Sequence, residues 1–391
     1  MVDYDPFSDE ALDDPNSIYR RLRAESPVHF LEKYDAWALT LFEDIWQLSM
    51  DNEHFTALKG TSSPYLLTRV IPPLPNLNHM DPPEQTKLRT AMMHFFMPRR
   101  VSSLEGRIRG WVTQCIDAFY DKGRGDIVVD LAQIIAVKVT CEAAGFPESD
   151  AEKMLDLVAR FTAREEGVDG MTADGVAAFG EILEYLAGLA AERRKYTGEV
   201  ESPIDVLVRA ESGGAPLSDD IVGQHLLLLL VGGTDTFPKV MATALTRLEE
   251  HPDQRAELAA DASLIPQALQ ECLRYDMPTQ FLMRSVSRQC ELRGKKLQPG
   301  HSIMFVYPSG NRDEREFEQP DRFDIRRDNP RILTFGHGAH RCLGAHFAKL
   351  EGKIMLEEVM RRMPEYRIDH SRAKLLRTEF VRGHLELPFE F

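Results

Sequence analysis

A long apolar helix constrains the fold of this chain more than any other feature of its sequence. Helical spacing runs over residues 218–250, where Ser218 can cap the free amides of the first turn and His251-Pro252 ends the pattern. This span corresponds to about nine turns of helix. Because residues 226–231 are apolar on nearly every face, we expect the helix to cross the protein interior rather than lie on its surface.

The remaining pattern predicts a mainly α-helical protein with smaller β-sheets, an α+β architecture. The chain has no Ser/Gly/Pro-rich linker, which favours one domain over residues 1–391. Within it we expect a β-richer N-terminal portion, about residues 1–60, and a helical body over about residues 61–391. Residues 28–30 and 36–39 flank a polar turn and predict a hairpin in the N-terminal portion.

Charge and hydropathy exclude several classes of protein. Lys and Arg number 47 against 62 Asp and Glu, and the net charge of −15 argues against nonspecific nucleic-acid binding. The first residues are acidic, and the longest purely apolar run, residues 226–231, is far too short to span a bilayer. We therefore expect a cytoplasmic monomer that binds neither nucleic acid nor a membrane.

The cysteines point to reduced thiols. They number five, are widely separated and include no Cys-x-x-Cys pair, which argues against a disulfide framework, a zinc site or an iron–sulfur cluster. Four of them are interpreted as small buried side chains; these are Cys115, Cys141, Cys272 and Cys290. The fifth has a different environment.

Cys342 lies in a glycine-rich loop, residues 335–344, directly before a helix-like run over residues 345–362. Glycines let the backbone approach a bulky planar ligand closely and adopt positive φ. A sulfur at a helix N-terminus faces free amides and the positive end of the dipole, which favours the thiolate. The pattern therefore predicts an anionic sulfur that one metal ion can bind.

A second motif, residues 232–236, interrupts the long helix. Its two glycines each cost about 1 kcal/mol of helix propensity, and Asp235 and Thr236 follow them. Pro238 lacks an N–H, so the carbonyl of Thr234 loses its usual donor and the helix is expected to kink. A groove for chemistry and a kink that serves only packing are both compatible with this motif.

Glu271 and Arg274 lie three residues apart on one predicted helix face, where they can pair with each other and with Arg322. Taken alone, such spacing is typical of an ordinary surface ion pair. However, the pair lies between residues 232–236 and the Cys342 loop, and the order of these three motifs is informative.

These three motifs together resemble the cytochrome P450 family. Phe-x-x-Gly-x-x-x-Cys-x-Gly at residues 335–344 resembles its haem-binding signature, and the other two motifs occur in the family's order, so that the resemblance covers nearly the whole chain. It implies the P450 fold, with haem b (iron protoporphyrin IX) between the central helix and the helix after Cys342. It also implies that Cys342 is the axial iron ligand, and that Glu271, Arg274 and Arg322 form a structural triad that supports the haem-binding core.

The resemblance implies a set of cofactor contacts as well. Two buried propionates need cationic or hydrogen-bonding partners. Gln85 occupies a position where many members have His. The implied cofactor-binding residues are Gln85, Arg89, Gly232, Arg284, Phe335, Gly338, His340, Cys342 and Gly344. His79, His94 and His346 are interpreted as having no such role.

The implied activity is that of a monooxygenase. Asp235 and Thr236 match the family's acid–alcohol pair, which delivers protons during oxygen activation, whereas Phe237 departs from the second Thr or Ser of many members. Electrons are expected from a separate ferredoxin or flavodoxin with its reductase. A basic docking face near the cysteine side is one interpretation of several scattered cations, namely Arg99, Arg100, Arg107, Arg109, Arg341 and Lys349.

The expected substrate is an apolar small molecule such as a terpenoid, a steroid or a fatty-acid-like compound. Gln280 or Thr279 is the candidate for holding one polar group. By resemblance the substrate-lining residues are Leu66, Leu67, Val70, Leu228, Val231, Thr279, Gln280, Leu282, Phe380 and Val381. A peroxide-driven haem-thiolate enzyme and a non-enzymatic haem sensor are the alternatives; the acid–alcohol pair disfavours both, and a sensor would also be expected to carry an output domain.

Overall fold

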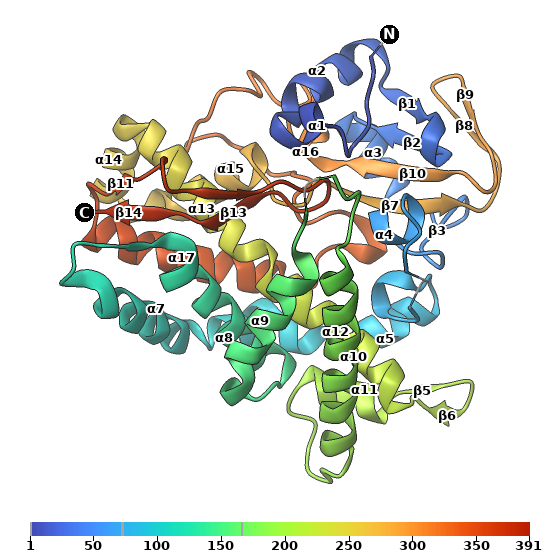
Figure 1. The fold of residues 1–391 in the computed structure, drawn as a ribbon, viewed down its shortest axis with the longest axis horizontal. Helices are drawn as coiled ribbons and strands as arrows, with labels where there is room; N and C mark the ends of the chain where they lie inside the picture. The colour runs from blue at the N-terminus through green and yellow to red at the C-terminus, as the bar shows by residue number, and fades with distance from the viewer. Residues whose placement is uncertain (1, 72–73, 166) are drawn as a thin grey trace.

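The computed structural model describes residues 2–71, 74–165 and 167–391. Helices dominate, and the largest sheet lies to one side, near the N-terminus (Figure 1). The α-helices are α1 (Asp9–Asp13), α2 (Pro15–Glu25), α3 (Phe42–Leu48), α4 (Ser63–Leu66), α5 (Glu84–Met93), α6 (Pro98–Ser102), α7 (Glu105–Tyr120), α8 (Gln133–Ala144), α9 (Ala151–Thr162), α10 (Ala173–Arg194), α11 (Pro203–Arg209), α12 (Asp219–Thr234), α13 (Thr236–Glu250), α14 (Pro252–Ala260), α15 (Ile265–Tyr275), α16 (Tyr307–Gly310) and α17 (Ala345–Arg362). This arrangement confirms the mainly α fold class with smaller sheets.

The strands form one five-stranded sheet and several small ones. They are β1 (Val28–Leu31), β2 (Ala36–Leu39), β3 (Phe55–Thr56), β4 (Arg124–Asp126), β5 (Glu211–Ser212), β6 (Ala215–Pro216), β7 (Phe281–Val286), β8 (Cys290–Leu292), β9 (Lys295–Leu297), β10 (Ser302–Val306), β11 (Arg367–Ile368), β12 (Lys374–Leu376), β13 (Gly383–Glu386) and β14 (Pro388–Glu390). Short 3-10 or π-helical turns join some elements, among them η2 (Leu77–His79), η4 (Ile127–Ala132) and η7 (Gly338–His340).

The five-stranded sheet joins strands from the N-terminal portion to strands from residues 281–306. The predicted hairpin is present, because β1 and β2 pair antiparallel with Val28 opposite Leu39. β10 then pairs parallel with β2 and antiparallel with β7, which gives the strand order β1-β2-β10-β7-β3. In Figure 1 the blue N-terminal strands lie beside the orange strands β7 and β10. Since β7 carries Arg284, this sheet positions one predicted cofactor contact.

The predicted central helix is present but is divided in two. α12 begins after Ser218, whose hydroxyl accepts a hydrogen bond from the amide of Ile221 at 3.3 Å. α13 begins at Thr236, so the break between the two helices falls at Asp235. Among the described residues this is the one helix long and apolar enough to cross a membrane, and 61% of its most apolar window is buried inside the protein. It is therefore the core helix that the sequence predicts.

The two glycines of the interrupted motif have different roles in packing. A Cβ at Gly233 would overlap the Thr140 hydroxyl of α8, so this glycine allows α8 to lie close to α12. A Cβ at Gly232 would meet no atom within 4 Å, and Gly232 is exposed. Packing accounts for Gly233, whereas Gly232 opens space beside the break.

The Glu271–Arg274 pair is buried rather than on the surface. Its Nε–Oε2 distance is 2.7 Å and both side chains are 0% exposed. The sequence prediction was wrong about the third member, because Arg322 is exposed and contributes only its backbone carbonyl, which accepts from Arg327. Arg327 donates its Nε to Glu271 at 3.1 Å. The chain turns at residues 320–327 so that the later arginine, five residues on, faces the acid.

Candidate active site

The Cys342 loop owes its shape to two glycines. Gly336 has φ +63° and Gly338 has φ +74°, a region that other residues rarely adopt. A Cβ at Gly338 would also overlap the carbonyl of Ser49. The loop is closed by the amide of Cys342, which donates to the Phe335 carbonyl at 2.7 Å, and α17 starts three residues later at Ala345. The sequence therefore predicted both the loop and the following helix correctly.

The Cys342 side chain is exposed, unlike those of Cys115, Cys141 and Cys272. Desolvation by the surrounding protein raises the pKa of the Cys342 thiol, and the Gly344 amide and the cations Arg89 and Arg341 only partly oppose this. A coordinated metal cation would deprotonate such a thiol outright.

Cationic and imidazole side chains gather near this loop, and among the described residues none of them forms an ion pair with an acid, although Asp81 lies close enough to Arg284 to influence its pKa. Arg284 is 9% exposed, makes no ion pair with any described residue, and has its pKa lowered by burial. Burial, together with Arg284 and Arg89, lowers the pKa of His340 to about 2. The His340 Nε2 atom is buried and has no hydrogen-bond partner among the described residues. Such a cluster is suited to an anion that accepts hydrogen bonds.

Gln85 contacts the Cys342 loop directly. Its side chain is buried and its Nε2 donates to the Ala339 carbonyl at 2.7 Å. Arg89, one turn later on α5, donates to the Arg341 carbonyl at 2.5 Å. Both residues therefore brace the Cys342 loop, and a direct contact of Gln85 with a propionate stays a prediction.

His79 belongs near the cluster, and sequence reasoning missed it. Burial lowers its pKa to about 4, the charge of Arg284 contributes to this lowering, and His79 in turn contributes to lowering the pKa of His340. Its Nδ1 lies 2.9 Å from the Leu74 carbonyl. The signal that could have found it is its position two residues before Asp81, whose carboxylate holds the amide of Ala57.

The break in the central helix carries the predicted acid and alcohol. The Thr236 hydroxyl donates to the Gly232 carbonyl at 3.2 Å. The Asp235 carboxylate is buried and pairs with the ammonium of Lys239, with an Oδ1–Nζ distance of 2.5 Å. Lys239 was not predicted. Phe237, which departs from the usual pattern, is buried and turned into the core.

The predicted substrate residues divide by exposure. Leu66 and Leu67 are buried around α4, Leu228 and Val231 are half-buried on α12, and Val70 is exposed. The segment after α15, which contains Thr279, meets the segment after β12, which contains Val381. Leu282 and Phe380 are half-buried, and Val381 is buried and bridges to Thr279.

Gln280, one of the two candidates for a polar substrate contact, has its side-chain amide bonded within the protein. Its Nε2 donates to the carbonyls of Met277 and Pro278, at 3.3 and 3.1 Å, and its side chain is buried. Thr279, which is half-buried, remains the candidate for a polar substrate contact.

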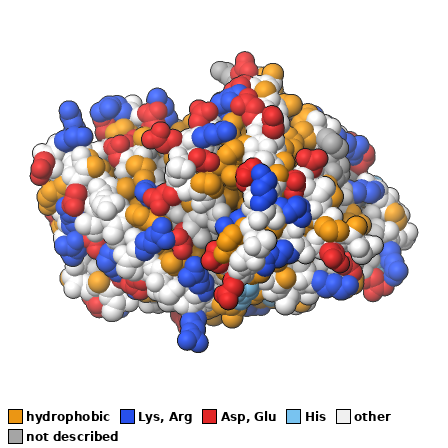
Figure 2. All heavy atoms as spheres, turned by 90° about the horizontal axis from the view of Figure 1, so that it is seen from below, with side chains coloured by type: hydrophobic (Ala, Val, Ile, Leu, Met, Phe, Trp, Pro, Cys, Tyr) orange, Lys and Arg blue, Asp and Glu red, His pale blue; other side chains and the backbone are white. Residues whose placement is uncertain are grey.

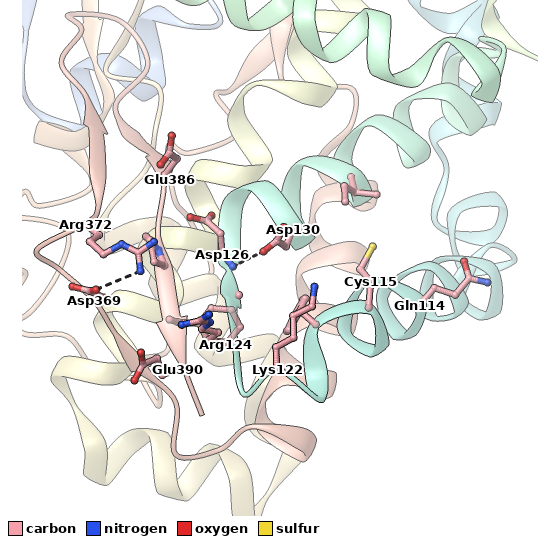
Figure 3. Close-up of a pocket in the computed structure, with 16 residues that line it drawn as sticks. Gln114, Cys115, Lys122, Arg124, Asp126, Asp130, Asp369, Arg372, Glu386 and Glu390 are labelled. Atoms are coloured by element: carbon pink, nitrogen blue, oxygen red, sulfur yellow. Dashed lines mark hydrogen bonds and ion pairs between the residues drawn. The ribbon is translucent and has the colours of Figure 1, made fainter.

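A separate pocket of about 670 Å³ lies between α7, β4 and β14. Figure 3 shows acidic and basic side chains of both signs around it, including the Asp369–Arg372 ion pair. None of the predicted site residues lines it. Burial raises the pKa of its one thiol, Cys115, which makes that thiol a poor nucleophile. This pocket lacks the chemistry found around Cys342.

The residues around Cys342 fit a haem. An exposed thiol side chain can supply one iron ligand, and Arg89, Arg284 and His340, which make no ion pair with any described residue, can bind two carboxylates. Gly232 and Gly344 leave open space, since a Cβ at either would meet no atom within 4 Å. A flat, dianionic prosthetic group satisfies all three features.

Comparisons with known proteins agree with this geometry. The family model described as "Cytochrome P450" matches residues 176–364. The cyclomarin C epoxidase CymV of Salinispora arenicola is 34% identical over 392 residues, covering 97% of this chain and 98% of the relative. Cytochrome P450 130 of Mycobacterium tuberculosis is 31% identical over 394 residues, covering 97% and 96%.

A solved structure with the same fold is that of P450BioI in complex with an acyl carrier protein ligated to hexadec-9Z-enoic acid. It has a TM-score of 0.86 and 27% identity, and the alignment covers 98% of this chain and 100% of that chain. The relatives match nearly the full length and include an epoxidase. This chain therefore belongs to the cytochrome P450 family, and it is an oxidoreductase of the monooxygenase class that uses a haem-iron cofactor.

Proposed function

We propose that this protein uses haem b, whose iron Cys342 would bind, to insert one atom of O2 into an apolar small organic substrate. The observation that carries the proposal is the combination of an exposed cysteine side chain with three nitrogen-bearing side chains, Arg89, Arg284 and His340, that make no ion pair with any described residue. A buried cation such as Arg284 without an ion pair is costly, and a bound anion would offset that cost.

When bound, the haem supplies the iron at which O2 is activated, and a thiolate ligand donates the electron density that favours O–O cleavage. The residues around the haem would hold it in place. Arg89, Arg284 and His340 would hold the propionates, with Gln85 bracing the loop. Phe335, Gly338 and Gly344 in the Cys342 loop, and Gly232 on the central helix, would contact the porphyrin.

Asp235 and Thr236 are proposed to deliver protons. The Thr236 hydroxyl already donates to the Gly232 carbonyl, so it can exchange that bond for one to a water or to the reacting oxygen. Asp235 follows directly at the helix break, where its carboxylate can take a proton from solvent and pass it on. This pair favours the O2-dependent reaction over the peroxide-driven alternative and over a haem sensor, neither of which needs a proton relay.

The proposed substrate is a terpenoid, a steroid or a fatty-acid-like compound. The half-buried apolar side chains of Leu228, Val231, Leu282 and Phe380 support it, and Thr279 is left as the polar contact. The solved P450BioI complex holds a fatty acid on an acyl carrier protein, so a substrate screen should include carrier-bound acyl chains beside free compounds.

Electrons are proposed to come singly from a ferredoxin or flavodoxin with its reductase. Arg100, Arg107 and Arg109 are already paired with acids of this chain. Arg99, Arg341 and Lys349 make no ion pair among the described residues, which leaves these three for a docking patch. Elsewhere the charges are mixed: Figure 2 shows acidic and basic side chains interspersed over one face.

The remaining expectations from the sequence stay proposals. One domain over residues 1–391 is supported by a hydrophobic core cluster that contains residues from Val28 to Phe389. A cytoplasmic monomer that binds neither nucleic acid nor a membrane is supported by the acidic charge and by the burial of the central helix.

The test is turnover with a surrogate ferredoxin and reductase against a panel of apolar compounds. We expect at least one compound to be oxygenated with O2 and reductant. Product formed only with added hydrogen peroxide would favour the peroxide-driven alternative, and haem binding without oxygenation under either condition would favour a sensor.

A further inference from the structure

Lys239 is a buried lysine whose charge the proposed chemistry has not yet used. Its side chain is 5% exposed and that of Asp235 is 8% exposed. Among the described residues its ammonium makes no other ion pair, and its Nζ also donates to the Asp235 backbone carbonyl at 2.8 Å. Burying an ammonium costs free energy that a surface position would avoid, which suggests that this ion pair has a function.

The backbone around the lysine fixes its position. Lys239 lies one helical turn after Asp235, directly after Pro238, so both partners come from the same break between α12 and α13. From the other side, a Cβ at Gly383 of β13 would overlap the methylene stem of Lys239. Because Gly383 lets β13 pack directly on that stem, the ammonium is held inside rather than free to reach solvent.

The ion pair occupies only one side of the carboxylate. Lys239 binds Oδ1 of Asp235, whereas Oδ2 has no hydrogen bond to any described residue and is not among the fully buried, unpartnered atoms. One oxygen is therefore anchored and the other is available to water. The Thr236 hydroxyl, on the next residue, bonds only to the Gly232 carbonyl among described residues.

We propose that Lys239 is a positioning residue for proton delivery: by anchoring Oδ1 of Asp235 it keeps Oδ2 directed to the water route that Thr236 completes. The proposal rests on the proposed monooxygenase function. Lys239 remains an ammonium throughout and contributes no net proton. It acts through the orientation of Asp235, since a carboxylate without a fixed partner can rotate and bond to the helix instead.

The test compares Lys239→Met, Lys239→Arg, Asp235→Asn and the double variant Asp235→Asn/Lys239→Met. For each, product per NADH consumed, hydrogen peroxide released and the solvent kinetic isotope effect on turnover are measured, together with haem content and substrate affinity. Lys353→Met is the matched control, because Lys353 also faces an acid four residues away, Glu357, but on α17.

We expect Lys239→Met to lower product per NADH roughly three- to tenfold, a part of the effect of general acid catalysis. Its solvent isotope effect should rise while haem content and substrate affinity stay at wild-type values. Lys239→Arg should recover part of the coupling, because it keeps the charge. In the double variant the loss should equal that of Asp235→Asn alone, and Lys353→Met should couple like wild type.

Wild-type coupling and isotope effect in Lys239→Met would overturn the role of Lys239. So would losses that add in the double variant, since independent residues give additive effects. If Lys239→Met does not fold, the test rests on Lys239→Arg, whose guanidinium is placed differently from the ammonium. Wild-type coupling and isotope effect in Lys239→Arg would then overturn the proposal that Lys239 positions Asp235. If Asp235→Asn itself turns over like wild type, the proposed relay fails rather than the Lys239 assignment within it.

Discussion

Two buried acid–base pairs in this protein differ in how completely they are satisfied. Glu271 accepts from Arg274, Arg327 and Asn329 and from the amide of Asp324, and Arg274 also donates to backbone carbonyls. Asp235 accepts through its carboxylate from Lys239 alone among the described residues. The first pair is 0% exposed, and the second pair is 5–8% exposed.

The comparison shows that burial alone does not separate a structural ion pair from a chemical one. A carboxylate with every lone pair occupied cannot accept a proton without breaking several bonds, so Glu271 is suited to holding α15 against the loop before Cys342. A carboxylate with one free oxygen can exchange a proton at little structural cost. The number of partners therefore distinguishes the roles of Glu271 and Asp235.

The largest expected effect is on the saturated pair. Glu271→Ala or Arg274→Ala leaves a buried charge unpaired, and should cost roughly 3–5 kcal/mol of stability and most of the haem content. Denaturant unfolding and the haem-to-protein ratio measure both. Arg327→Ala should also destabilise, whereas Arg322→Ala should not; the reverse order would show that the structure pairs the wrong arginine.

The sparse pair should affect rate and coupling more than stability, because the amide oxygen that Asp235→Asn introduces can still accept a hydrogen bond from Lys239. Asp235→Asn should slow turnover roughly a hundredfold, because an amide cannot relay a proton as a carboxylate does. Thr236→Ala should keep consuming NADH but release more of the electrons as hydrogen peroxide. Product, peroxide and NADH are measured together; variants with normal rate and coupling would reduce residues 232–238 to a packing kink.

Arg284 extends the comparison to a buried charge with no acidic partner. Arg284→Met should stabilise the haem-free protein, because it removes an uncompensated buried cation, and should weaken haem binding by about 1–3 kcal/mol. Thermal unfolding of the haem-free protein measures the change in stability, and haem transfer kinetics measure the change in haem binding. Equal destabilisation of both forms would mean that Arg284 is structural and has no role in holding propionates.

The smallest effects concern the two glycines. Gly233→Ala should cost about 1–3 kcal/mol through overlap with Thr140. Gly232→Ala should be neutral or stabilise by up to about 1 kcal/mol, since it raises helix propensity and meets no atom. The free energies of unfolding of the two variants compare the glycines directly. Equal values would contradict the assignment of Gly233 to packing and of Gly232 to a groove.

The sequence predicts what is determined by local spacing. The positive-φ glycines of the Cys342 loop, the start of α12 and the Glu271–Arg274 pair all lie within a few residues of their signals. Arg327 and Gln85 could not be assigned, because their partners depend on how a loop folds back on α15 or on the Cys342 loop. Lys239 was within reach: it lies four residues after Asp235, a spacing that predicts an ion pair on one helix face.

The most direct test of thiolate-bound haem is the absorption spectrum of the reduced protein under carbon monoxide. Wild type should give the strongly red-shifted Soret band that a thiolate ligand produces opposite carbon monoxide. Cys342→His should retain some haem, lose that band and lose oxygenation, because imidazole is a weaker donor. Cys290→Ser, at a half-buried thiol, should behave as wild type. A red-shifted band that survives in Cys342→His would contradict the assignment of Cys342 as the iron ligand.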